Sequence, residues 1–159
     1  MRIFDMDIDL RVDDKEFKGN IRDVLKINEG QIHDELIEQP STYAWFATLT
    51  EIAKANVEKH KMNIKVLRAR LDEEKRELLG KGGVKVTEPK VESAIEKDER
   101  LIVLVEEMIE LSKNASILKA LTDALNQRKD MLIQLSSFKR QEMFMGDYPD
   151  LNNVRNKNR

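Results

Sequence analysis

One long amphipathic pattern dominates the sequence and covers residues 41–79, STYAWFATLTEIAKANVEKHKMNIKVLRARLDEEKRELL. Its apolar residues recur in steps of three, four or seven, which is the spacing of a narrow coiled-coil seam. The seam consists of Phe46, Leu49, Ala53, Val57, Ile64, Leu67, Leu71 and Leu78, with His60 in the one gap. Because so long a helix is unstable alone in water, the pattern predicts a partner along its length.

A second amphipathic helix follows a glycine-rich turn. Three glycines between residues 80 and 83 end the first pattern, and Thr87 can cap the next helix with Pro89 in its first turn. The buried face of this helix is predicted at Val91, Ile95, Ile102, Val105 and Ile109. A further seam is out of step with that face, at Leu118, Leu121, Leu125, Leu132 and Leu135. We therefore expect the helix to bend or break near Asn114, or to twist toward a different neighbour.

The first forty residues predict shorter elements. In residues 6–13 apolar and charged side chains alternate, which predicts a short edge strand with no evident pairing partner in the chain. Asp13 or Asp14 can cap a helix that uses Phe17, Ile21, Val24 and Leu25. Pro40 marks the end of this region, and Ser41 is a plausible N-cap for the long helix that follows.

These boundaries divide the chain into three parts. Residues 1–40 form an acidic N-terminal extension with short helices, residues 41–145 form a long-helix hairpin hinged at 80–90, and residues 146–159 form a flexible tail. The predicted fold is all-α, a coiled-coil-like antiparallel helical hairpin with a short strand-like or helical N-terminal extension. The seams carry more apolar surface than one hairpin can cover, so the hairpin is predicted to be oligomeric.

The composition argues against several classes of protein. Of the 159 residues 36% are charged, the net charge is −2, and there is no cysteine, which excludes disulfide and thiolate chemistry. His33 and His60 lie far apart, and no Glu-x-x-His motif is present, so a metal or acid–base site has little support. No apolar run approaches the roughly 20 residues that cross a bilayer, which predicts a soluble protein. Nothing argues for an enzyme, a cofactor or a metal.

Charge is unevenly distributed along the chain. Residues 54–71 contain six basic residues and one acidic residue, whereas residues 91–110 contain seven acidic residues and two basic ones. An antiparallel hairpin would bring these two stretches together, and their opposite charges would favour that pairing.

The basic residues of the first helix follow its seam. On a helical wheel one ~60° band beside the seam contains Lys54, Lys61, Lys65 and Arg68. Lys59 and Arg70 lie on the other flank. Such residues often only solubilise a coiled coil, but spaced cations along a rod also match a phosphate backbone. The segment Gly80-Lys81-Gly82-Gly83 lacks the spacing of a phosphate-binding P-loop, so we interpret it as a turn whose Lys81 can also contact phosphate.

The centre of the first helix resembles a known family. The segment Leu67-Arg68-Ala69-Arg70-Leu71-Asp72 is similar to the Leu-(Lys/Arg)-Ala-Arg-Leu-Asp segment of the phage recombination mediator UvsY family. Further landmarks in the same order, over roughly residues 36–143, are Tyr43, Trp45, Thr87-Glu88, Lys90, Lys97-Asp98, Ala124-Leu125 and Arg128. The chain departs from the family in its acidic N-terminal extension, in Pro89 and in its longer C-terminal tail.

The resemblance implies a function. Members of the family are helical, ring-forming oligomers that bind single-stranded DNA without sequence preference. They help load a RecA-like recombinase onto strands covered by single-strand-binding protein, which would place this chain in the cytoplasm of a phage-infected bacterial host. In that family the two basic residues of the segment are associated with DNA binding, and here they are Arg68 and Arg70.

We therefore predict a single-stranded DNA-binding recombination mediator. The predicted nucleic-acid contacts are Lys54, Lys61, Lys65, Arg68, Arg70, Arg76, Lys81 and Lys85. The predicted oligomerisation surface is a stripe that we expect the first helix to leave uncovered, formed by Leu118, Leu121, Leu125 and Leu132. The alternative is a structural coiled-coil scaffold or phage assembly protein that binds no nucleic acid and whose cations only solubilise the rod.

Overall fold

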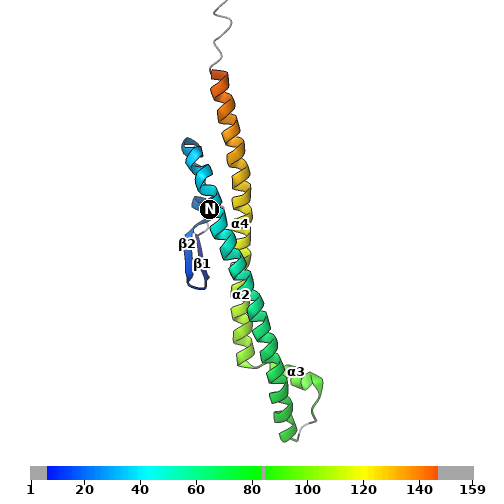
Figure 1. Ribbon diagram of the computed structural model, residues 1–159. Coiled ribbons are helices and arrows are strands. Elements are labelled where there is room, and N and C mark those ends of the chain that lie inside the picture. Colours follow the sequence, from blue (N-terminus) through cyan, green and yellow to red (C-terminus); the bar gives the residue numbers. More distant parts are fainter. Residues whose placement is uncertain (1–6, 84, 147–159) are drawn as a thin grey trace, which may run out of the picture. The chain divides into compact units, whose positions relative to one another are not determined.

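The computed structural model describes residues 7–83 and 85–146, which form a mostly helical fold with a small N-terminal sheet (Figure 1). In chain order the elements are β1 (Asp7–Val12), β2 (Lys15–Asn20), α1 (Ile21–Leu25), the 3-10 helix η1 (Glu29–Gln31), α2 (Ile32–Lys81), α3 (Glu88–Glu96) and α4 (Glu99–Gly146). Of the predicted tail, only Gly146 lies among the described residues, and it ends α4.

The chain divides into two compact units. The described part of the first unit contains residues 7–8, 18–46 and 121–146, and that of the second contains residues 9–17, 47–83 and 85–120. In each unit a part of α2 packs against a part of α4, and the contacts show that the two run antiparallel. In the first unit Glu35 contacts Arg128 and Gln39 contacts Leu125. In the second unit Glu74 contacts Arg100 and His60 contacts Glu107. Within each unit α2 and α4 therefore run antiparallel, as predicted for the helical hairpin.

The N-terminal extension contains a β-hairpin as well as a short helix. In β1 every second residue is buried, with Ile8, Leu10 and Val12 at 8%, 2% and 5% exposure, as the alternating sequence predicts. Its partner is β2, which pairs antiparallel to it, so the chain does supply the strand that the sequence did not reveal. The turn between them has Asp13 at φ 54°, a left-handed conformation that aspartate tolerates.

This hairpin corrects two predictions. The fold is not purely α-helical, and no helix begins at Asp13 or Asp14. Residues 15–20 are extended, and helix α1 begins only at Ile21, where the side chain of Asn20 accepts a hydrogen bond from the Arg22 N–H at 2.9 Å. Asn20 is therefore the N-cap in place of the predicted aspartates.

Helix α2 also begins earlier than predicted. It starts at Ile32 and runs through Pro40, so the predicted boundary at Pro40 and the N-cap at Ser41 are wrong. A proline inside a helix removes one backbone N–H and crowds the preceding turn. Here the flanking turns are held by tertiary contacts, since Ile32 and Gln39 are both buried. The Ser41 hydroxyl donates to the Glu38 carbonyl at 2.8 Å, a bond made within the helix.

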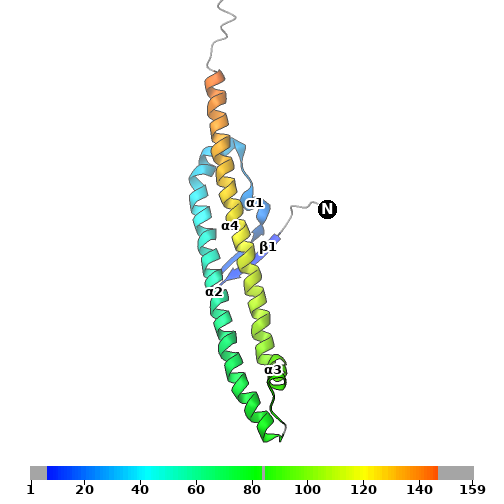
Figure 2. The same ribbon diagram turned by 90° about the vertical axis from the view of Figure 1, so that its right-hand side faces the viewer.

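The seam of α2 is buried over most of its length. Buried seam residues include Phe46, Leu49, Ala53, Val57 and Leu71, as predicted. The predicted burial of Leu78 is wrong, because its side chain is 67% exposed. The neighbouring Leu79 packs instead against the core of the second unit. That core consists of Leu71, Val91, Ile95 and Leu101, so α3 lies against both α2 and the start of α4 (Figure 2).

The helix predicted after the glycine-rich turn is broken between Glu96 and Glu99, well before the predicted position near Asn114. Thr87 occupies the N-cap of α3 as predicted, although its side chain makes no capping hydrogen bond, and α3 ends at Glu96. Helix α4 then runs without interruption through Asn114, so of the alternatives predicted there, a break is wrong. The real break changes the helical phase and buries Leu101, whereas Ile102 and Ile109 are 43% and 57% exposed instead of buried.

Candidate nucleic-acid interface

The predicted cation stripe on α2 is interspersed with acids. Two of its lysines pair with glutamates three residues earlier on the same helix: Lys54 Nζ lies 2.7 Å from Glu51 Oε1, and Lys61 Nζ lies 2.7 Å from Glu58 Oε1. Steps of three and four residues place these glutamates on the face that carries the lysines. Exposed pairs of this kind contribute about 0.2–1 kcal/mol each, so a polyanion can compete with them.

Three more of the predicted contacts are also ion-paired. Arg68 Nη1 donates to Glu92 Oε1 at 2.9 Å. Arg76 donates to Asp72 at 2.7 Å and to Glu88 at 2.6 Å, and Lys81 pairs with Glu77. The hydrogen bonds to Glu88 and Asp72 raise the pKa of Arg76 above its ordinary value, so its charge is already engaged within the chain. Five of the eight predicted contact residues therefore have an acidic partner within the chain.

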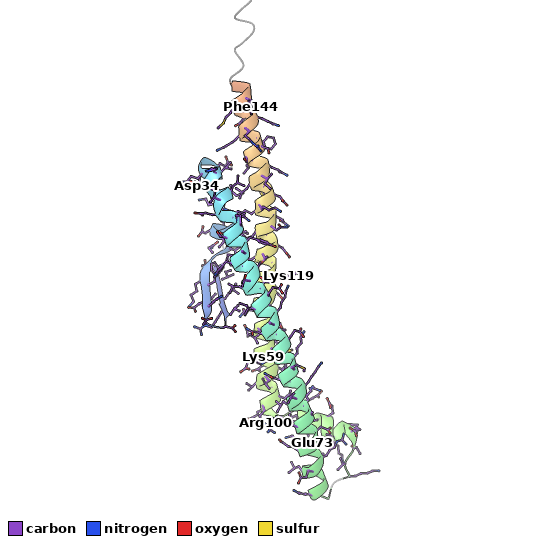
Figure 3. All side chains as sticks on the ribbon, in the orientation of Figure 1. Asp34, Lys59, Glu73, Arg100, Lys119 and Phe144 are labelled. Carbon is purple, nitrogen blue, oxygen red and sulfur yellow. The ribbon has the colours of Figure 1, made fainter. Side chains whose placement is uncertain are left out.

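The other three predicted contacts are exposed and unpaired. Lys65, Arg70 and Lys85 form no ion pair with any residue in the ranges 7–83 and 85–146. The same holds for Lys59, which is labelled on α2 in Figure 3. Residues 59–71 contain five basic residues and no acidic one, so this part of α2 is the most consistently cationic surface of the second unit.

A polar hollow lies beside Lys59 in the second unit. Its volume is about 510 Å³, and its lining residues are Arg11, Asp13, Asn56, Lys59, His60, Asn63, Leu111 and Asn114. The β-hairpin turn reaches it, because Asn56 Nδ2 donates to Asp13 Oδ1 at 2.7 Å. Sequence reasoning missed this site because it depends on the unrecognised strand pairing.

His60 is a structural residue of the α2 seam. Its side chain is 17% exposed, and its Nε2 atom lies 3.2 Å from Glu107 Oε2 on α4. This contact brings the basic part of α2 and the acidic part of α4 together, as the charge distribution predicts. His60 Nε2 is itself buried and makes no hydrogen bond with the described residues.

The break between α3 and α4 is organised by one carboxylate. Asp98 Oδ2 accepts from Lys75 at 2.8 Å, and Asp98 Oδ1 accepts from the backbone N–H of Arg100 at 3.1 Å. Arg100 also donates to Glu74 Oε2 at 2.7 Å. Figure 3 labels Arg100 and also Glu73, which directly precedes Glu74. The side-chain hydrogen bonds from Arg100 and Lys75 hold the pKa of Asp98 well below its ordinary value.

Acid should weaken this junction. Hydrogen bonds from arginine also lower the pKa of Glu74 and Glu88, so all three carboxylates stabilise the fold fully above about pH 5 and progressively less as the pH falls toward their lowered pKa values. We expect the melting temperature of the D98N variant to depend less on pH between about pH 5 and 2 than that of the parent. The E96Q variant should match the parent, because Glu96 is exposed and has no ion pair among the described residues. Equal pH dependence in D98N and the parent would contradict this assignment.

The predicted oligomerisation stripe is buried within the chain. Leu118, Leu121, Leu125 and Leu132 have exposures of 0%, 3%, 0% and 0%. The expectation that α2 leaves this face uncovered is therefore wrong. The period of the leucines is a correct signal for a core, but a single sequence does not distinguish a core within one chain from a core between chains.

A buried charge network holds the first unit together, and sequence reasoning missed it. Arg128 is 8% exposed and donates to Gln39, to Glu35 and, at 3.0 Å, to the backbone carbonyl of Lys26. Gln39 is 4% exposed and donates in turn to the Leu125 carbonyl at 2.7 Å. The network links the segment before α2, α2 itself and α4. Its only sequence signal is a cation at one position of a leucine seam.

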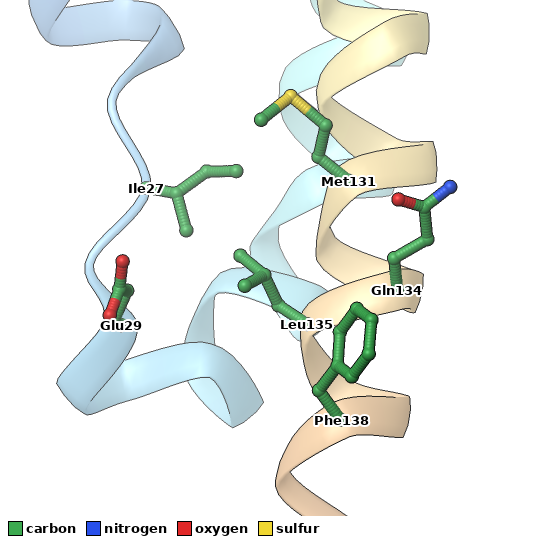
Figure 4. Close-up of a pocket in the computed structure, with 6 residues that line it drawn as sticks. All are labelled: Ile27, Glu29, Met131, Gln134, Leu135 and Phe138. Atoms are coloured by element: carbon green, nitrogen blue, oxygen red, sulfur yellow. The ribbon is translucent and has the colours of Figure 1, made fainter.

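The first unit also has an apolar hollow of about 260 Å³ (Figure 4). Its lining residues are Ile27, Glu29, Met131, Gln134, Leu135 and Phe138. Met131 and Phe138 are 56% and 63% exposed, so much of the hollow's apolar lining is open to solvent. Nearby on α4, Phe144 is 73% exposed.

The described part of the chain contains no group of three or more His, Asp or Glu side chains that could hold a metal ion. None of the described helices combines the length and apolar character needed to span a membrane. Comparison with protein-family models, curated proteins and solved structures gave no match.

Proposed function

We propose that the chain binds single-stranded DNA without sequence preference and acts as a recombination mediator. The observation that carries this proposal is the acid-free segment 59–71 of α2, in which Lys59, Lys65 and Arg70 are exposed and unpaired among the described residues. Phosphates are bound by such spaced cations, and a strand of variable sequence requires no deep pocket.

The apolar surface of α2 between these cations could accommodate the bases of a DNA strand. Met62 and Val66 are 60% and 48% exposed, and Ala55 and Ala69 are exposed on the same outer face of α2. On a helical wheel this apolar face has Lys65 at one edge and Lys59 and Arg70 at the other. A single strand lying along it would place bases over apolar side chains and phosphates near cations, which suits binding without base-specific hydrogen bonds.

The recombination role rests on the resemblance of residues 67–72 to the UvsY family. In this proposal the chain helps to load a RecA-like recombinase onto strands covered by single-strand-binding protein in a phage-infected cell. It does so as a homo-oligomeric ring, because a few cations per subunit bind DNA weakly and repeated subunits add avidity. Since the leucine stripe is buried, the proposed contacts between copies shift to exposed apolar residues of α4 such as Met131, Phe138 and Phe144.

A titration of a labelled oligonucleotide, followed by fluorescence anisotropy at several salt concentrations, tests DNA binding. We expect the K59A/K65A/R70A variant to bind more weakly and to lower the slope of log K against log salt by about 2, because each lost phosphate contact removes about 0.7. The matched control is K90A/K97A/K119A, which removes three exposed cations that lie outside α2 and lack ion pairs in the described structure. Equal weakening by both triple variants would mean that only net charge matters.

A structural coiled-coil protein is the second candidate. It is favoured by the five predicted contacts that already have acidic partners, since such pairing is typical of cations that only stabilise and solubilise a helical rod. Absence of binding by the parent protein even at low salt would support this candidate and refute the first.

A further inference from the structure

The short helix α3 carries two carboxylates that face predicted DNA-binding arginines of α2. Glu92 Oε1 accepts from Arg68 at 2.9 Å, and Glu88 Oε2 accepts from Arg76 at 2.6 Å. Residues four apart share one face of a helix, so α3 presents both carboxylates to α2 together. Carboxylate and phosphate oxygens compete for the same guanidinium N–H groups, so a glutamate in this position occupies the place of a phosphate.

These glutamates are not what holds α3 in place. Val91 and Ile95 of α3 are 1% and 3% exposed and form a core cluster with Leu71 and Leu101. The side chains of Glu88 and Glu92, in contrast, are 77% and 54% exposed. The apolar face therefore anchors the helix, while the acidic face lies at the surface, where another anion can displace it.

We infer that α3 is an autoinhibitory cover, whose Glu88 and Glu92 mask Arg76 and Arg68 and lower the affinity of the chain for single-stranded DNA. This inference rests on the proposed function. Arg68 belongs to the segment that resembles the recombination mediators, so the cover acts on the residue most closely tied to that function. The hydrogen bond from Arg76 lowers the pKa of Glu88, so this carboxylate of the cover is charged at neutral pH.

The chain offers a charge-matched control. Glu96 on α3 and Glu99 at the start of α4 are exposed and form no ion pair with the described residues. The E88Q/E92Q and E96Q/E99Q variants therefore add the same net charge within the same short stretch of chain. Only the first pair of changes removes carboxylates that Arg68 and Arg76 contact, although Arg76 keeps its bond to Asp72. The difference between the variants therefore measures masking separately from net charge.

We expect E88Q/E92Q to bind a labelled single-stranded oligonucleotide several-fold more tightly than E96Q/E99Q at low salt. Its salt slope should be steeper than that of the control by about 0.7 to 1.4, the values for one and two additional phosphate contacts, because Arg76 keeps its bond to Asp72. In an R68A/R76A background the advantage of E88Q/E92Q should disappear. Circular dichroism should show the same helicity in all variants, because the apolar anchor of α3 is unchanged.

The outcomes separate this inference from the proposed function. If the parent binds DNA and E88Q/E92Q binds no more tightly than E96Q/E99Q, masking is overturned and DNA binding stands. If E88Q/E92Q keeps its advantage in the R68A/R76A background, masking of these arginines is likewise overturned. Failure of every variant to bind at low salt would refute both proposals, whereas binding by E88Q/E92Q alone would support both.

Discussion

Replacing Glu35 with alanine should lower the free energy of unfolding by about 3–5 kcal/mol, because it leaves the buried guanidinium of Arg128 without its counter-charge. The variant also loses the hydrogen bond that the Asn28 N–H donates to Glu35 Oε1 at 3.0 Å. Urea unfolding followed by circular dichroism measures the effect. E38A is the control, since Glu38 is exposed on the same helix and its side chain has no ion pair among the described residues.

A double replacement tests whether the loss comes from the unpaired charge. In E35A/R128M both charges are gone, and methionine fills much of the space of the arginine side chain. We expect this variant to be more stable than the sum of the two single losses predicts. Strict additivity would mean that Glu35 and Arg128 do not stabilise the fold as a pair.

Replacing Leu125 with alanine should cost about 2–5 kcal/mol of unfolding free energy, the range for a leucine fully enclosed by a core. Leu125 is 0% exposed, whereas Ile133, two turns further along α4, is 51% exposed. I133A is therefore the control and should change stability little. Similar losses in both variants would show that Leu125 is not enclosed.

The burial of Leu125 also bears on assembly. An interface stripe would allow the L121D/L125D variant to remain helical as smaller species, but a core within the chain cannot accept two carboxylates at several kcal/mol each. We now expect this variant to lose its helical circular dichroism signal. If light scattering instead shows that the variant is folded and has a lower mass than the parent, the leucine stripe is a contact between copies.

Periodicity revealed those features that depend on neighbouring residues in one element. The seam from Phe46 to Leu71 was predicted because burial along a helix follows a fixed angular step. The ion pairs of Lys54 and Lys61 could have been predicted in the same way, since Glu51 and Glu58 each precede a lysine by three residues. The sequence prediction considered the cations of α2 without the acidic residues on the same helix face. It therefore overstated how many of these cations are unpaired.

Features that depend on distant residues were not predictable in this way. Pro40 signals a boundary locally, and only tertiary contacts of the surrounding turns explain its place inside α2. The break at Lys97-Asp98 has no glycine or proline, and it is fixed by Lys75 and Arg100 through Asp98. Arg128 finds its partners on segments that no local pattern connects to it.

The pairing of Arg128 with the carbonyl of Lys26 joins residues 102 positions apart. Closing so large a loop costs chain entropy that its contacts recover only when the loop is complete. The junction around Asp98, in contrast, uses residues no more than 26 positions apart, from Glu74 to Arg100. During synthesis the α2–α3–α4 turn can therefore assemble while the end of α4 is still absent. The first unit completes its contacts only after Arg128 and the rest of α4 have been made.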